Sequence, residues 1–203
     1  MMTETLAIYG GTFSPPHIGH IRAAEAFYDA IRPSRLLVMP SATPPHKAPV
    51  AGADDEARLA MCRLAFSHIP HTEVSDLEIA RQGKSYTVYT LRALAAPGRS
   101  LCMLVGTDMF LTLDSWYMSR EIFALSEIAV MRRESDPGKT ALLKKQEKRL
   151  TEEFCARVRF IDADVTEISS SDLRARITAG LPTEGYLTAE VEAYIRKCHL
   201  YQA

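Results

Sequence analysis

Long apolar runs are absent from this sequence of 203 residues. None approaches the roughly 18–20 residues that are needed to cross a bilayer, so we expect neither a membrane span nor a membrane partner. The first residues, MMTETLAIYGG, lack the basic-then-apolar order of a secretory signal peptide. Together these absences predict a cytoplasmic protein.

Cysteine is scarce, and there is no excess of positive charge. The four cysteines, at positions 62, 102, 155 and 198, form no C-x-x-C pair that would indicate zinc or a redox dithiol, so we expect reduced thiols. Lys and Arg number 24 against 25 Asp and Glu, which excludes the strong basic excess of a general nucleic-acid binder. The basic residues between 139 and 149 alternate with leucines and predict the solvated face of a helix. A hydrophobic content of 47% excludes a largely disordered chain.

Short apolar runs alternate with helical patterns along the chain. Strands are predicted at 6–9, 36–39, 74–79, 101–105, 128–131 and 158–161, and helices from 18, over 59–69, after 85, over 143–154, and around 173–177 and 189–197. This alternation is typical of an α/β protein with a doubly wound parallel sheet and helices on both faces. No repeat or linker interrupts it. We expect one domain over residues 1–203, with a small helical C-terminal part from about residue 168.

The motif GGTFSPPHIGH, at residues 10–20, directly follows the first predicted strand. Gly10 and Gly11 allow a sharp turn and a close approach to a ligand. His17 and His20 share one face of a predicted helix start, where free N–H groups and the positive end of the helix dipole favour phosphate. A pair of histidines at this spacing is also found in zinc sites, but no third ligand stands at a recognisable spacing, so we expect no protein metal site.

A second motif, ISSSDLR, stands at residues 168–174 before another helical pattern. One of its three serines is expected to cap the helix. The other hydroxyls, the helix N-terminus and Arg174 can together hold a polyphosphate. The alternative is an ordinary serine cap followed by an exposed arginine.

These two motifs resemble, in order and in separation, the two signatures of the nucleotidylyltransferase superfamily. The segments PPHK at 44–47, SYT at 85–87, GTD at 106–108 and WY at 116–117 narrow the resemblance to the bacterial nicotinate-nucleotide adenylyltransferases. The likeness runs from Leu6 to about Tyr194. Two positions depart from the family pattern, since Ser14 stands where aspartate is usual and Ser171 where threonine is usual.

The resemblance implies a Rossmann-like nucleotidylyltransferase fold and the transfer of AMP from ATP to nicotinate mononucleotide, without a covalent intermediate. ATP would arrive with Mg²⁺. The alternatives are an adenylyltransferase for nicotinamide mononucleotide or phosphopantetheine, or a nucleotide-binding module without catalysis. The sequence leaves open whether the chain forms a homo-oligomer.

The resemblance also implies a role for each motif residue. The catalytic contacts would come from His17, His20, Lys47 and Arg174. ATP would lie along Gly10, Gly11, Thr12, Phe13, Gly106, Asp108, Ser170 and Ser171. The mononucleotide would be bound by Ser85, Tyr86, Thr87, Trp116, Tyr117 and Arg133, with Arg132 as a nearby substitute for Arg133. Ordinary alternatives exist for three of them: a solvated Lys47, an Asp108 that caps a helix, and a core Trp116.

Overall fold

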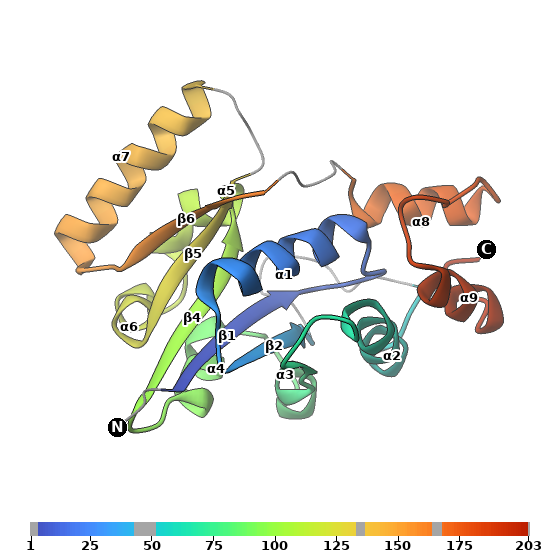
Figure 1. Cartoon of the computed structure of the whole chain (residues 1–203), viewed down its shortest axis with the longest axis horizontal. Coiled ribbons are helices and arrows are strands. Elements are labelled where there is room, and N and C mark those ends of the chain that lie inside the picture. The colour runs from blue at the N-terminus through green and yellow to red at the C-terminus, as the bar shows by residue number, and fades with distance from the viewer. Residues whose placement is uncertain (1–3, 43–51, 133–136, 164–167, 203) are drawn as a thin grey trace.

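A parallel β-sheet runs through the centre of the protein, whose computed structural model describes residues 4–42, 52–132, 137–163 and 168–202 (Figure 1). The sheet has six strands in the order β3-β2-β1-β4-β5-β6. Their bounds are β1 Glu4–Gly11, β2 Arg35–Pro40, β3 Thr72–Val74, β4 Arg99–Gly106, β5 Ser126–Arg132 and β6 Val158–Asp162. Every neighbouring pair is parallel, so the doubly wound sheet predicted from the sequence is confirmed.

The helices occupy most of the predicted positions. They are α1 Ile18–Ile31, α2 Asp55–Phe66, α3 Leu77–Arg81, α4 Thr87–Leu94, α5 Thr107–Leu111, α6 Ser119–Leu125, α7 Pro137–Phe154, α8 Ser170–Thr178 and α9 Ala189–Lys197, with the 3₁₀ turn η1 at Leu113–Ser115. The short elements α5, η1 and α6 were not predicted. Within the described residues, no helix has both the length and the apolar character that a membrane span requires.

The predicted strand over 74–79 is wrong beyond its first residue. The strand β3 ends at Val74, and the Ser75 hydroxyl then accepts a hydrogen bond from the Leu77 N–H at 3.3 Å. The Asp76 carbonyl accepts from the Ala80 N–H at 2.7 Å, which begins α3. Polar side chains that turn the backbone locally therefore outweigh the alternating pattern.

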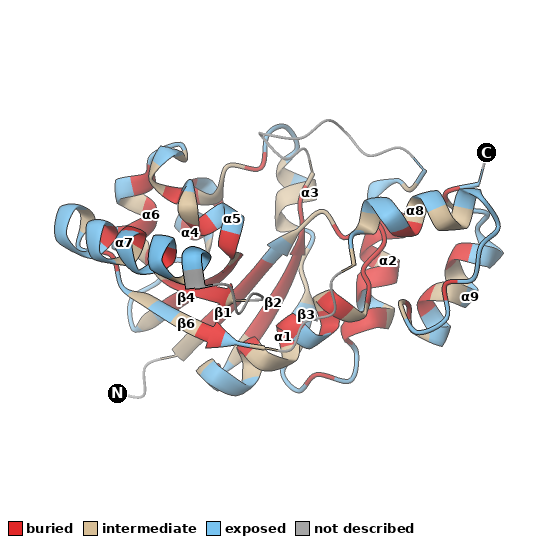
Figure 2. Cartoon of the chain, turned by 90° about the horizontal axis from the view of Figure 1, so that it is seen from above, coloured by how far each residue is buried: buried red, intermediate tan, exposed pale blue. Residues whose placement is uncertain are grey.

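The strands divide the core into two layers. On β1, Ala7 and Tyr9 join one buried cluster, while Leu6 and Ile8 join the other. Residues of α1, α2, α8 and α9 complete the first cluster, and residues of α4, α5, α6 and α7 complete the second. Figure 2 shows the buried residues along the strands and on the inward sides of the helices. Helices on both faces are thus confirmed.

The strand order reverses between β1 and β4, whose connections leave toward opposite faces of the sheet. In sheets of this order, ligands bind in the crevice beyond the carboxyl ends of the strands at that point. The C-terminal helices α8 and α9 lie near α2 and share the cluster of α1 and α2 (Figure 1). We propose, on the basis of this shared core, that the chain folds as one domain.

Candidate active site

The carboxyl ends of β1 and β4 form an edge of bare backbone. Tyr9 of β1 stands opposite Leu104 of β4, so Gly10 lies one residue and Gly106 two residues further along neighbouring strands. A Cβ added at Gly10 or at Gly106 would meet no atom within 4 Å, and neither glycine has a positive φ. The fold itself therefore does not require glycine at these two positions, which leaves room for a ligand close to the backbone.

Gly11 is glycine for a different reason. A Cβ there would lie 2.8 Å from the Phe13 ring, which is buried against Tyr9 and Phe66 at centroid distances of 5.2 and 5.7 Å. Phe13 itself has a φ of 47°. Phe13 as a whole is only 1% exposed, so its ring offers no free surface to a ligand.

The two histidines of the early motif stack on each other. Their ring centroids lie 3.7 Å apart, as the predicted shared helix face requires, and Phe13 contacts His20 edge-on at 5.1 Å. The His17 backbone N–H donates to Nδ1 of His20 at 3.2 Å. Since Nδ1 is then an acceptor, the neutral His20 ring carries its proton on Nε2. His17 is buried and His20 is half-buried.

The start of α1 is already partly occupied by the protein. The Ile18 N–H donates to the Tyr186 carbonyl at 2.9 Å, and the His17 N–H is taken by His20. The prediction of free N–H groups is therefore wrong for these two residues. The two imidazole rings are among the polar groups that the helix start can offer to a phosphate.

The late motif lies directly against the early one, although more than 150 residues separate them in sequence. The Ser170 hydroxyl donates to the Pro15 carbonyl at 3.0 Å. Arg174 donates to the Ser14 carbonyl at 2.7 Å and to the Ser171 hydroxyl at 3.1 Å. Of the three serines, Ser169 is the N-cap of α8, and it accepts from the Asp172 N–H at 3.1 Å, which confirms that one of them caps the helix. The late motif thus holds the loop at 12–17 in addition to any contact with phosphate.

Two residues that hold this loop were not predicted from the sequence. Arg58 on α2 is buried and donates to the Thr12 carbonyl at 2.9 Å, while its ion pair with Asp55 resembles an ordinary surface pair three residues apart. Tyr201 shares a hydrogen bond of 3.0 Å with the Ser14 hydroxyl. No periodicity or motif marks either contact, so only the fold reveals them.

At the end of β4, Asp108 is exposed in the first turn of α5. The N-cap of α5 is Gly106, so the alternative role of Asp108 as a helix cap is wrong. Thr107 is buried and donates from its hydroxyl to the Met131 carbonyl at 3.4 Å. Asp108 therefore faces solvent beside the open backbone of Gly106.

Four of the residues predicted to bind the mononucleotide lie at or beside the start of α4, which begins at Thr87; they are Ser85, Tyr86, Thr87 and Tyr117. The Ser85 hydroxyl accepts from the Ala42 N–H at 3.0 Å. The rings of Tyr86 and Tyr117 lie 4.8 Å apart, and Tyr117 is 50% exposed. Trp116 is half-buried against the second core cluster, which fits the alternative of a core residue.

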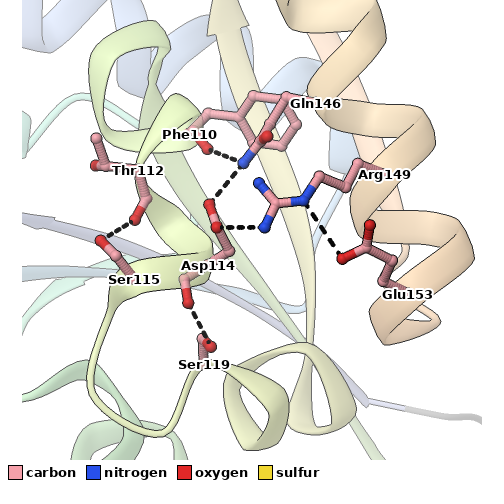
Figure 3. Close-up of polar contacts among 8 residues, drawn as sticks. All are labelled: Phe110, Thr112, Asp114, Ser115, Ser119, Gln146, Arg149 and Glu153. Carbon is pink, nitrogen blue, oxygen red and sulfur yellow. Dashed lines mark hydrogen bonds and ion pairs between the residues drawn. The ribbon is translucent and has the colours of Figure 1, made fainter.

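The segment that carries Trp116 and Tyr117 is tied to α7 by a polar network around Asp114 (Figure 3). The Asp114 carboxylate accepts from Gln146 at 2.8 Å and from Arg149 at 2.9 Å, and its carbonyl accepts from the Ser119 hydroxyl at 2.8 Å. Burial opposes ionisation of this carboxyl, but the hydrogen bonds and the charge of Arg149 prevail and lower its pKa.

Three further residues were named from the sequence, Lys47, Arg132 and Arg133. Lys47 and Arg133 lie outside the described residues. Arg132 is engaged in a two-bond ion pair with Asp162 at 2.7 and 2.6 Å, so it would have to leave that pair to replace Arg133. Among the described residues, no three His, Cys, Asp or Glu side chains gather as metal ligands.

A sheet of this order, with open glycines at the reversal point and histidines at the next helix start, belongs to the nucleotide-binding α/β class. Residues 8–176 match the family model described as cytidylyltransferase-like, and the chain belongs to that family. Within it, whole-length relatives at 32–37% identity place the chain in the nicotinate-nucleotide adenylyltransferase group.

The chain is 34% identical over 211 residues to a probable nicotinate-nucleotide adenylyltransferase of Trichlorobacter lovleyi, across 97% of this chain and 99% of the relative. A protein of the same name from a Roseiflexus species is 37% identical over 206 residues, across all of both chains. The structure of Plasmodium falciparum nicotinic acid mononucleotide adenylyltransferase complexed with NaAD superposes with a TM-score of 0.74. It covers 98% of this chain and 97% of its own, and at 16% identity it supports the fold alone.

Proposed function

We propose that this protein transfers AMP from ATP to nicotinate mononucleotide, giving nicotinate adenine dinucleotide and pyrophosphate in NAD biosynthesis. The observation that carries the proposal is whole-chain identity of 32–37% to relatives named as probable nicotinate-nucleotide adenylyltransferases. The open backbone at Gly10 and Gly106, beside the two motifs, supports the proposal. A cytoplasmic location remains a prediction.

In this reaction an oxygen of the mononucleotide 5′-phosphate attacks the α-phosphorus of ATP. A new P–O bond forms there, and the bond from the α-phosphorus to the oxygen bridging to the β-phosphorus breaks, so that pyrophosphate leaves. The nucleophile is already an anion near neutral pH, and no strong general base is needed. Catalysis then depends on alignment and on neutralising charge that moves to pyrophosphate.

His20 is suited to that task because its neutral ring carries a proton on Nε2 and can donate it to a phosphate oxygen. His17, stacked on His20, supports the ring and contacts the same phosphates. Arg174 and Ser171, at the start of α8, would hold the β- and γ-phosphates. The bare backbone at Gly10 and Gly106 lets ATP approach the sheet edge.

The mononucleotide would lie on the side of α4. Its pyridine ring is positively charged and favours the face of an exposed aromatic ring, which Tyr117 offers beside Tyr86. The nicotinate carboxylate would accept hydrogen bonds from N–H groups of residues 85–87 at the start of α4.

Mg²⁺ enters as part of the substrate, because ATP arrives as its magnesium complex and Mg²⁺ in such complexes keeps mostly phosphate and water ligands. The described residues fit this arrangement, since the edge offers imidazoles, hydroxyls and backbone rather than a carboxylate cluster. The ion would stay with the ATP phosphates beside His20 and Arg174.

The test is pyrophosphate release from ATP and Mg²⁺ with nicotinate mononucleotide, nicotinamide mononucleotide or phosphopantetheine as acceptor. We expect a strong preference for the nicotinate substrate, and the loss of turnover in His20→Ala. His68→Ala is the matched control, because His68 lies on the surface and pairs with Glu25. Preference for another acceptor would favour that adenylyltransferase, and ATP binding without release would favour a non-catalytic module.

A further inference from the structure

Tyr201 lies in the C-terminal turn, yet its hydroxyl reaches the loop at 12–17. The side chain is only 5% exposed, and its hydroxyl lies 3.0 Å from Oγ of Ser14. Ser14 is fully buried, so its side chain faces the interior and not the open edge where ATP would lie. The Ser14 carbonyl accepts from Arg174 at 2.7 Å. Residue 14 is therefore held twice, once at its side chain and once at its backbone.

Tyr201 is itself fixed by contacts on both sides. Its N–H donates to the Gly52 carbonyl at 3.2 Å, and its carbonyl accepts from the Thr178 hydroxyl at 2.8 Å. Gly52 has a φ of +97°, and a Cβ there would lie 2.8 Å from the tyrosine ring. The Gly52 backbone therefore limits the movement of the ring, and the Thr178 hydroxyl of α8 fixes the backbone that carries it. Burial raises the pKa of Tyr201 to about 12, so its hydroxyl stays protonated in the physiological range.

We propose that Tyr201 is a positioning residue of the active site, which acts through Ser14 to fix the loop that ends at His17 and leads into α1, where His20 lies. Tyr201 does not contact substrate. It holds the backbone three residues before His17, so its loss would let the imidazoles drift from the phosphates. This inference rests on the proposed function, because the roles of the two histidines do.

The proposed mechanism separates this effect from a general loss of stability. The mononucleotide would bind beside Tyr86 and Tyr117, which belong to other elements. Loosening the loop should thus lower kcat while leaving the KM for nicotinate mononucleotide nearly unchanged. A variant that is merely less stable would keep the kcat of its folded fraction.

The experiment compares Tyr201→Phe, Ser14→Ala and the double variant in the complete chain. Removing one buried hydrogen bond should lower kcat about 5- to 10-fold in each single variant, and the double variant should lose no more, since both remove the same contact. Ser126→Ala is the matched control. Its hydroxyl is as fully buried as that of Ser14, but it donates to the Ile122 carbonyl at 2.9 Å, in the packing of α6 on β5. We expect this control to lose stability and keep kcat.

A second readout needs no turnover. The imidazole NMR signals of His17 and His20 should shift in Tyr201→Phe and stay in place in Ser126→Ala. Unchanged histidine signals, a wild-type kcat in Tyr201→Phe, or strictly additive losses in the double variant would overturn the inference. A wild-type protein that releases no pyrophosphate while its histidine signals shift in Tyr201→Phe would instead refute the proposed function and leave the positioning contact established.

Discussion

Gly10 and Gly11 are neighbours in sequence, but alanine at each should fail in a different way. A Cβ at Gly11 would lie 2.8 Å from one Phe13 ring carbon and 3.0 Å from two more, and that ring is 1% exposed with no room to retreat. Overpacking of this kind costs about 1–3 kcal/mol of unfolding free energy. At about 2–4 °C per kcal/mol for a chain of this length, the melting temperature should fall by about 2–12 °C.

Gly10→Ala should leave the fold intact or slightly more stable, by about 0.5–1 kcal/mol, because its Cβ meets nothing within 4 Å and alanine restricts the unfolded chain. The same methyl group would stand in the path of the ATP phosphates. A displacement of substrate by about 1 Å can cost about 100-fold in rate, so we expect a loss of that order in kcat/KM for ATP.

The assay pairs thermal unfolding with pyrophosphate release for both variants. A Gly10→Ala enzyme with wild-type kcat/KM would refute the placement of ATP along this edge. A Gly11→Ala protein with a wild-type melting temperature would show that the Phe13 ring moves aside. Either result would contradict the assignment of Gly10 to ligand access and of Gly11 to packing against Phe13.

Three further predictions concern the elements around the site. Arg58→Met leaves the Thr12 carbonyl without its donor, which should cost about 1–3 kcal/mol in urea unfolding; an unchanged midpoint would contradict this. Asp54→Ala removes the N-cap of α2, whose carboxylate accepts from the Ala57 N–H at 2.8 Å, and should cost about 1 kcal/mol by the same measurement. The lowered pKa of Asp114, which Gln146 and Arg149 produce against the effect of burial, contributes stability above the unfolded value of about 4 that is lost at lower pH. Asp114→Asn should therefore flatten the fall in melting temperature below that pH, and an unchanged slope would disprove the link.

The central strands were predictable because they are buried on both faces. The middle residues of β1 and β4, 6–9 and 101–105, are all apolar and buried, so a short apolar run indicates a parallel strand without ambiguity of face. The start of α1 was predictable for a related reason, since His17 and His20 lie three residues apart before a clear helical period. Local pattern and final structure agree at these positions.

Other features depend on contacts that no local pattern records. The Ser75 hydroxyl bond that ends β3 competes with alternation, and the short helices α5 and α6 have too few turns to show a period. The reason for Gly11 lies in a ring two residues away that folds back with a φ of 47°. Tyr201 and Ser14 meet only because α8 and α9 return to the β1 end of the sheet.

The loop at 12–17 has a particular place in the order of synthesis. The glycines and histidines of the early motif are synthesised early, but the Pro15 carbonyl bonds to a residue 155 positions later, the Ser14 carbonyl to one 160 positions later, and the Ser14 hydroxyl to one 187 positions later. Closing contacts over such separations is entropically slow, so this loop is among the last parts of the chain to become rigid. A growing chain can therefore complete most of its sheet while it still lacks a working phosphate site. The protein becomes competent for catalysis late and in one step, when the C-terminal helices fold back onto the loop at 12–17.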